Sequence, residues 1–326
     1  MIIHFDRVLS CLAMLLGTGL LVTGILAGDP TPAHAGCPAL AAVAHTAVTA
    51  QDVDQLRVLH DEAQRDLSCD GVFRQKLGQA LALALARRAA GVDEPTSRME
   101  LLNEALAYAR PWQVLAALGD LFHEQHAYDR AVAFYQEALT VLNDPGLTPH
   151  EPSLATVERL FRLAVQSRLL ATDYVGTPVT RAGTPGGLAA PRFRGGFVPV
   201  AVPVPIRFAY NADRFTEAGL KAAEDLLEHL TQEGAPAIRL AGHTSPEGGD
   251  AFNCALSRRR AEALGNFLRT RGYAGLIEIT AMGKREPLEL VNANHYTQTE
   301  TYEMLRRVEL IRLSVAGQES GRACPL

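Results

Sequence analysis

The sequence has no excess of positive charge and lacks the short motifs that mark most catalytic sites. Its 31 Lys and Arg residues are outnumbered by 36 Asp and Glu residues, which gives a net charge of −5. Such a balance provides no electrostatic attraction for nucleic acid. We find no Gly-x-Ser-x-Gly elbow, no phosphate-binding glycine loop, no metal-ligand spacing and no carboxylate pair placed for acid–base work. We therefore expect a protein that is not an enzyme, holds no metal or cofactor and binds no nucleic acid.

Charge is also missing from residues 8–28, which are dominated by Leu, Val, Ile, Met, Ala and Gly. Arg7 precedes this run, and Ala33-His34-Ala35 follows it. A charged start, an apolar run and a small-x-small site are typical of a secretory signal peptide, so we predict that residues 1–35 are removed before Gly36. The alternative is that the run, roughly 20 residues long, stays uncut and makes contact with a membrane as an anchor.

Cysteine is scarce, and its number fits an exported protein. The chain has five cysteines, and removal of the signal peptide would discard Cys11. The four that remain are an even number, which favours disulfides in an oxidising compartment. No Cys-x-x-Cys spacing suggests a metal site. Pairing within domains is the most economical arrangement and predicts the bonds Cys37–Cys69 and Cys254–Cys324.

Residues 36–175 are rich in Ala and Leu and show helical spacing nearly throughout. The clearest part resembles the tetratricopeptide repeat in order and spacing, through Leu118-Gly119, Phe122, Tyr128, Ala131, Tyr135 and Ala138. Gly119 would let two antiparallel helices approach, while Tyr135 would fill the space between them. Weaker repeat features begin at Leu77-Gly78. This helical domain could present a surface to a partner protein, or it could be a spacer.

The composition changes abruptly at residues 176–200, where Gly and Pro predominate. We interpret this segment as a linker or an irregular connection. Hydrophobic residues alternate after it, in Val202, Val204, Ile206 and Phe208. Because two prolines interrupt this alternation, we expect a strand at the edge of a sheet.

The most informative stretch lies between Gly242 and Arg260. It reads Gly-His-Thr-Ser-Pro-Glu-Gly over 242–248, then has Asn253, Leu256-Ser257 and Arg260-Ala261. Arg260 falls on the apolar face of a predicted helix, where a guanidinium is costly unless it is paired or reaches a polar cavity. The spacing places Asn253, Ser257 and Arg260 on one side of that helix.

These residues, with Leu305-Arg306-Arg307-Val308-Glu309 near the C-terminus, closely resemble the OmpA-like C-terminal domain family over about residues 200–316. The resemblance implies non-covalent binding of peptidoglycan. It also implies an α/β sandwich of βαβαββ order after the helical domain, so that the fold class is α + α/β. The strands and helices expected from the pattern are Val202–Phe208, Thr216–Gln232, Ala237–Gly242, Phe252–Arg271, Leu276–Ala281 and Arg307–Val315.

The resemblance implies a site for the diaminopimelate of the stem peptide, in which the helix Arg holds the carboxylate and an Asp after His-Thr holds the ammonium. Arg260 stands at the Arg position, but Ser245 replaces the Asp and Leu305 replaces an Asn. Glu247 could supply the missing charge. The full set of expected ligand-binding residues is Thr244, Ser245, Glu247, Asn253, Ser257, Arg260 and Arg307. The alternative for Arg260 is an internal ion pair.

We therefore expect a non-catalytic protein of a Gram-negative envelope, in the periplasm and associated with the outer membrane. Its OmpA-like domain, residues 201–316, would bind peptidoglycan, and its helical domain would bind another envelope protein. A tail would follow at 317–326. Two alternatives remain open: a scaffold or assembly adaptor whose OmpA-like domain has lost cell-wall binding, and a protein anchored in the inner membrane by residues 8–28.

Overall fold

The computed structural model describes residues 38–178, 180–182, 184, 186–190, 192–209, 211–313 and 323–325. The chain divides into two compact units, and the division falls inside a helix, between Ala117 and Leu118. The predicted signal peptide and the apolar run 8–28 lie outside the described residues. Within the described ranges, no helix is both long enough and apolar enough to cross a membrane.

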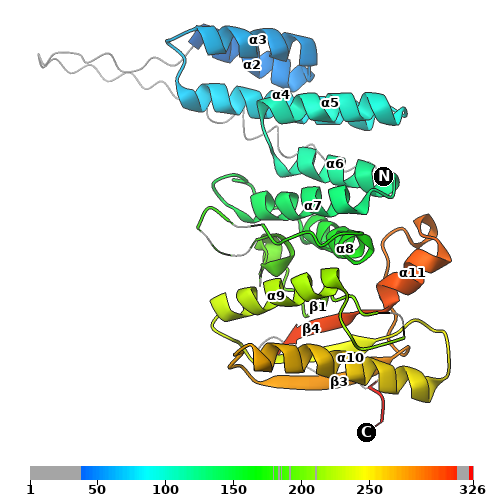
Figure 1. Ribbon diagram of the computed structural model, residues 1–326. Helices are drawn as coiled ribbons and strands as arrows, with labels where there is room; N and C mark the ends of the chain where they lie inside the picture. Colours follow the sequence, from blue (N-terminus) through cyan, green and yellow to red (C-terminus); the bar gives the residue numbers. More distant parts are fainter. Residues whose placement is uncertain are drawn as a thin grey trace, which may run out of the picture. The chain divides into compact units, whose positions relative to one another are not determined.

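The described part of the first unit, residues 38–117, consists of helices joined by short turns (Figure 1). Asp52 and Asp70 begin two of them, since each carboxylate accepts a hydrogen bond from a backbone N–H of the first turn. Gly78 allows close packing, because a Cβ there would lie 3.1 Å from the carbonyl oxygen of Tyr108. The helices are α2 (Pro38–Ala50), α3 (Val53–Arg65), α4 (Gly71–Ala90), α5 (Pro95–Tyr108) and the first part of α6 (Trp112–Glu124).

The second unit begins with the rest of α6, followed by α7 (Tyr128–Asn143) and α8 (Leu154–Leu170). Gly119 and Tyr135 meet as the sequence predicts: a Cβ on Gly119 would lie 2.6 Å from the ring of Tyr135. The hydroxyl of Tyr135 donates to Asp120, which also accepts from Arg159 of α8. This helical layer, residues 118–170, is therefore tied together by a buried aromatic ring and a charged network.

The Gly- and Pro-rich segment 176–200 has only two 3₁₀ turns in its described part, η1 (Gly187–Ala189) and η2 (Arg194–Gly196). It is irregular in structure, yet it packs onto the helical layer. Leu188 and Phe193 are fully buried, and the Phe193 ring meets that of Phe161 on α8 at 5.7 Å. The domain limits drawn from composition at 175 and 201 stay a prediction.

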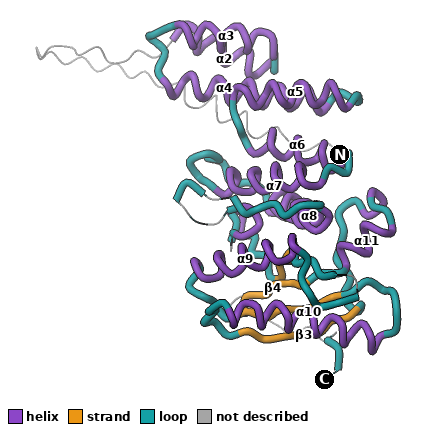
Figure 2. Tube along the Cα trace, viewed as in Figure 1, coloured by secondary structure: helices purple, strands orange, loops and turns teal. Residues whose placement is uncertain are grey.

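A four-stranded sheet follows, drawn in orange in Figure 2. Its strand order is β1-β4-β2-β3. Its strands are β1 (Ala201–Val204), β2 (Ile238–His243), β3 (Ile277–Gly283) and β4 (Val308–Arg312). The pairs β1–β4 and β4–β2 are antiparallel, and β2–β3 is parallel. The proline-containing β1 lies at an edge, as predicted, because a proline lacks the N–H that an inner strand needs.

Two helices, α9 (Glu217–Gln232) and α10 (Asp250–Thr270), pack against one face of this sheet. Thr216 caps α9, because its side chain accepts a hydrogen bond from the backbone N–H of Gly219. Leu220 is 36% exposed, because the first turn of α9 approaches through Gly219, whose Cβ would lie 2.1 Å from the carbonyl oxygen of Arg207. Phe252, in the first turn of α10, is 47% exposed beside Gly248. We call β1–β4 with their helices the sheet domain.

A helix that the sequence analysis does not anticipate, α11 (Gln298–Leu305), precedes β4. A capping box begins it: Thr297 accepts from the backbone N–H of Glu300, whose carboxylate accepts from the N–H of Thr297. A 3₁₀ turn, η3 (Ala293–His295), lies just before it. The expected order βαβαββ therefore becomes βαβαβαβ, and α11 ends directly before Arg306 and Arg307.

Candidate functional site

The candidate site lies at the loop that leaves β2 and enters α10. Gly242 brings strand and helix together, because a Cβ at this position would lie 2.1 Å from the backbone oxygen of Ser257. Gly248 adopts a positive φ of 84°, which lets the loop turn back. Asn253, buried in the first turn of α10, donates to the carbonyl oxygen of Glu247 at 2.9 Å and fixes the loop.

Arg260 is the most unusual side chain of this site. It is only 5% exposed, and its Nε donates to the carbonyl oxygen of Ala212 at 3.0 Å. Its guanidinium lies 5.3 Å from the centre of the Phe208 ring. None of the described carboxylates forms an ion pair with it. The internal ion pair that would explain a buried guanidinium is therefore absent from the described part of the chain.

The electrostatic surroundings of Arg260 favour an anion. Burial, and then the neighbouring cations Arg306 and Arg259, lower the pKa of Arg260 to about 10, while Asp213 acts in the opposite direction. The group remains charged near neutrality. A carboxylate placed on it would relieve both the burial of an unpaired charge and the repulsion between guanidinium groups.

A second part of the site carries negative charge. Ser245 is buried, and its hydroxyl donates to the carboxylate of Glu247 at 3.1 Å. The side chain of Glu247 is 65% exposed, and Nη1 of Arg306 lies 3.9 Å from it. Ser245 therefore orients a carboxylate that remains accessible to a ligand. The site presents a buried cation, Arg260 of α10, and an exposed anion, Glu247 of the loop before α10.

Ser257, in contrast, uses its hydrogen bonds inside the protein. It is fully buried, donates to the carbonyl oxygen of Cys254 and accepts from the N–H of Gly283. It ties α10 to the end of β3. Asn253, Ser257 and Arg260 do share the buried face of the helix, as predicted, but each has a different partner. The structure shows Asn253 and Ser257 as groups that hold the site together.

Arg307 lies beneath the site and is 3% exposed. Its Nε donates to Glu309 at 2.7 Å, and Nη2 donates to the carbonyl oxygen of Glu286. The imidazole of His243 lies 3.4 Å from the other oxygen of Glu309. Burial alone would raise the pKa of Glu309, but His243 and Arg307 outweigh burial and bring that pKa down to about 2. The group is a buried charge cluster that joins β2 to β4.

Four polar atoms in and beside this cluster have no hydrogen-bond partner among the described residues. They are Nδ1 and Nε2 of His243, Oγ1 of Thr244, which is 5% exposed, and Nη1 of Arg307. The backbone N–H of Thr244 donates to Gly283, which places its side chain at the ends of β2 and β3. Thr244 is therefore a buried hydroxyl with unused hydrogen-bonding capacity next to Ser245.

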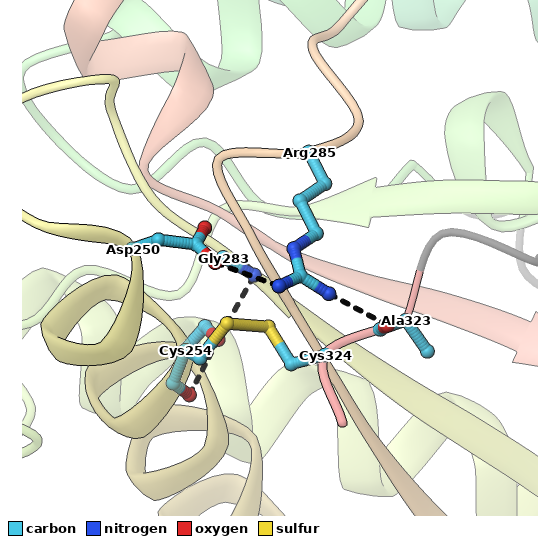
Figure 3. Close-up of a disulfide and its surroundings, with 7 residues drawn as sticks. Asp250, Cys254, Gly283, Arg285, Ala323 and Cys324 are labelled. Carbon is cyan, nitrogen blue, oxygen red and sulfur yellow. Dashed lines mark hydrogen bonds and ion pairs between the residues drawn. A yellow bond between two sulfur atoms is a disulfide. The ribbon is translucent and has the colours of Figure 1, made fainter.

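A disulfide between Cys254 and Cys324 closes the far side of the site, and it is the pair expected for this part of the chain. It fixes the C-terminal residues along the edge strand β3, where the N–H of Cys324 donates to Ala281. Arg285 strengthens the same contact through Asp250 and the carbonyl oxygen of Ala323 (Figure 3). The other predicted bond, Cys37–Cys69, includes Cys37, which lies outside the described residues.

No protein-family model matches the chain. Over 105 residues it is 30% identical to the peptidoglycan-associated lipoprotein of Legionella pneumophila. The C-terminal part of this chain is OmpA-like. The match covers 32% of the chain and 57% of the relative, so the chain spans little more than half the length of that relative. We use the name OmpA-like domain for the sheet domain from here on.

Three solved structures illustrate the similarity. The peptidoglycan-associated lipoprotein from Burkholderia pseudomallei is 20% identical, with 35% of this chain and 89% of that chain covered and a TM-score of 0.29. The cell wall anchor of the T6SS from Pseudomonas aeruginosa is 21% identical, with 34% and 78% covered and a TM-score of 0.28. An OmpA-like domain from Francisella tularensis is 16% identical, with 34% and 69% covered and a TM-score of 0.26.

The sequence analysis missed two residues of the OmpA-like domain that shape the site. Arg306 comes from the end of α11 and lies beside both Glu247 and Arg260. Phe208 supplies the ring beneath Arg260. Arg306 stands in the quoted Leu-Arg-Arg motif, so the motif could have suggested it, whereas only the fold brings Phe208 to this place.

Proposed function

We propose that this protein binds peptidoglycan non-covalently through its OmpA-like domain. The observation that carries the proposal is Arg260, a buried guanidinium without an ion pair to any described carboxylate. The relative from Legionella is, by its name, a peptidoglycan-associated protein, which supports the same assignment. The ligand group on Arg260 is a carboxylate, which a planar guanidinium holds with two parallel hydrogen bonds.

The stem peptide of diaminopimelate-type peptidoglycan offers the matching chemistry, because the distal end of that residue has both a carboxylate and an ammonium. We propose that Arg260 receives the carboxylate and Glu247 the ammonium. Ser245 orients Glu247, which compensates for the missing Asp. Arg306 adds positive charge on the carboxylate side and keeps Glu247 partly neutralised until an ammonium arrives.

We also propose that the protein works in the bacterial envelope, as peptidoglycan binding requires, and that its helical domain binds another envelope protein there. The alternative is a scaffold whose OmpA-like domain no longer binds the cell wall. The replacement of the family's Asp by the uncharged Ser245 favours this alternative, because Ser245 alone cannot balance an ammonium.

Co-sedimentation with two kinds of purified sacculi tests the assignment. Lysine-type peptidoglycan has the ammonium but lacks the distal carboxylate of diaminopimelate. We expect the protein to sediment with diaminopimelate-type sacculi and much less with lysine-type sacculi. Glu247→Gln should weaken the first interaction, whereas Glu262→Gln, a substitution at an exposed position of the same domain, should leave it unchanged. If the protein sediments with neither kind of sacculi, peptidoglycan binding is refuted and the scaffold function is the one that remains.

A further inference from the structure

Three histidines stack where the helical layer meets the OmpA-like domain. His123 lies at the end of α6, His126 follows it in the turn before α7, and His295 belongs to η3. The ring of His295 stacks on His126 with centres 4.6 Å apart and on His123 with centres 5.2 Å apart. His295 Nε2 also donates to the carbonyl oxygen of His123 at 3.0 Å. All three belong to the second compact unit.

The hydrogen bonds of His123 define its protonation state. Tyr296 donates its hydroxyl proton to Oε1 of Gln166 at 2.6 Å, so this hydroxyl can only accept from Nε2 of His123, 2.9 Å away. Nδ1 of His123 lies 2.9 Å from the hydroxyl of Ser167 and accepts from it. His123 is therefore the neutral tautomer with its proton on Nε2, and both ring nitrogens are in use.

The other groups around His123 oppose a second proton. Arg159 of α8 lies near it, as do the two other imidazoles, while the α7 rings of Tyr128 and Tyr135 cover its sides. The acids in reach are already engaged. Asp120 pairs with Arg159, and Glu300 accepts from His126, Tyr128 and its own capping box.

From these contacts we propose that His123, His126 and His295, together with Tyr296, form an acid-sensitive latch that holds segment 293–305 on the helical layer. Near neutrality the buried ring of His123 is uncharged and the contact is closed. In mild acid a proton on His123 is a cation that is 4% exposed, lies against two other imidazoles and has no free carboxylate. The contact then opens, because the released histidine can take up its proton in water.

The direction of the titration supports this mechanism. Burial, and then His295 and His126, lower the pKa of His123 from the ordinary 6.5 to about 4. At a pH between these two values, His123 binds the proton only in the open state of the latch. The ratio of closed to open latch therefore falls about tenfold for each unit by which the pH decreases. Glu300 stays ionised through this range, because its hydrogen bonds outweigh burial and lower its pKa to about 2.

The latch also lies at one end of α11, whose other end leads into Arg306 and Arg307. Opening it would free the segment that positions these arginines. The proposal itself does not require that the protein bind peptidoglycan, and the measurement below is made without cell wall.

Hydrogen exchange followed by mass spectrometry on the whole purified protein tests the latch. We expect the protection of peptides within 293–305, corrected for intrinsic exchange rates, to fall about tenfold per pH unit from pH 6.5 to pH 4.5. Peptides from the middle of α10 provide the internal reference. His123→Gln should make the profile of 293–305 flat, and His150→Gln, at an exposed position, should keep the wild-type slope.

Two further measurements keep the test decisive. Tyr296→Phe removes two hydrogen bonds, the one to Gln166 and the one from His123, but leaves His123 buried, so it should lower protection at pH 7 and keep the slope. A side-chain NMR titration of the wild type should place the pKa of His123 well below 6. The proposal is overturned if His123→Gln retains the wild-type slope, or if His123 titrates near 6.5 while 293–305 stays equally protected.

Discussion

The disulfide between Cys254 and Cys324 should stabilise the OmpA-like domain strongly, because it closes a long loop. The two cysteines are 70 residues apart in sequence. In the chain-entropy treatment, a loop of this length removes about 15 cal/mol/K from the unfolded chain, which corresponds to about 4 kcal/mol at 25 °C. For a cooperative unit of about 200 residues, each kcal/mol shifts Tm by roughly 2–4 °C. The double variant Cys254→Ser/Cys324→Ser should therefore unfold about 8–16 °C below the wild type.

Thermal unfolding followed by circular dichroism, with and without reductant, provides the measurement. Reductant should lower the Tm of the wild type towards that of the double variant. In the double variant, any remaining effect of reductant reports on other cysteines. A double variant that melts within 2 °C of the wild type would contradict this prediction. The attachment of the C-terminal residues to the edge strand β3 would then contribute nothing to stability.

Other predictions concern packing and pH. Gly119→Ala should destabilise the helical layer by roughly 1–3 kcal/mol, because its methyl would meet the Tyr135 ring at 2.6 Å. Gly71→Ala is the matched control, since a Cβ there has no neighbour within 4 Å. If denaturant unfolding shows the same loss of stability for both variants, the packing account is contradicted. Glu309 has a pKa lowered to about 2. The Glu309 carboxylate therefore makes its full contribution to the free energy of unfolding above the ordinary pKa near 4.5. This contribution, at most about 3 kcal/mol, is lost as the pH falls towards 2. Glu309→Gln should remove that part of the acid dependence in urea unfolding curves, and an unchanged acid dependence would count against the charge cluster.

Much of the OmpA-like fold follows from local patterns in the sequence. The alternation in 237–242 and the helical spacing of 252–271 locate β2 and α10 to within a few residues. Pro203 within the strand and Pro205 just after it are consistent with the edge position of β1. Gly119 and Tyr135 meet as their types predict. These predictions succeed because each depends on a periodicity or on one residue's conformational limits.

The features that escape prediction depend on contacts between distant segments. The latch joins His123 to Tyr296 across 173 residues, and nothing local marks either as a partner of the other. Helix α11 is short and only weakly amphipathic, so its capping box is its main local feature. Ser257 fits a ligand site by spacing alone, and only the fold shows that Gly283 and Cys254 take up its hydroxyl.

The most direct test of the proposed function is the binding of diaminopimelate-type sacculi by Arg260→Leu. This variant removes the guanidinium, with its charge and its hydrogen-bond donors, and leaves an apolar side chain at the same position of α10. The loss of a bidentate, charge-assisted pair costs about 2–5 kcal/mol, so binding should weaken by roughly 30-fold or more. Arg258→Leu, on the same helix but outside the buried face, should bind like the wild type, and circular dichroism should show both variants folded. Equal sedimentation of the wild type and a folded Arg260→Leu would contradict the account.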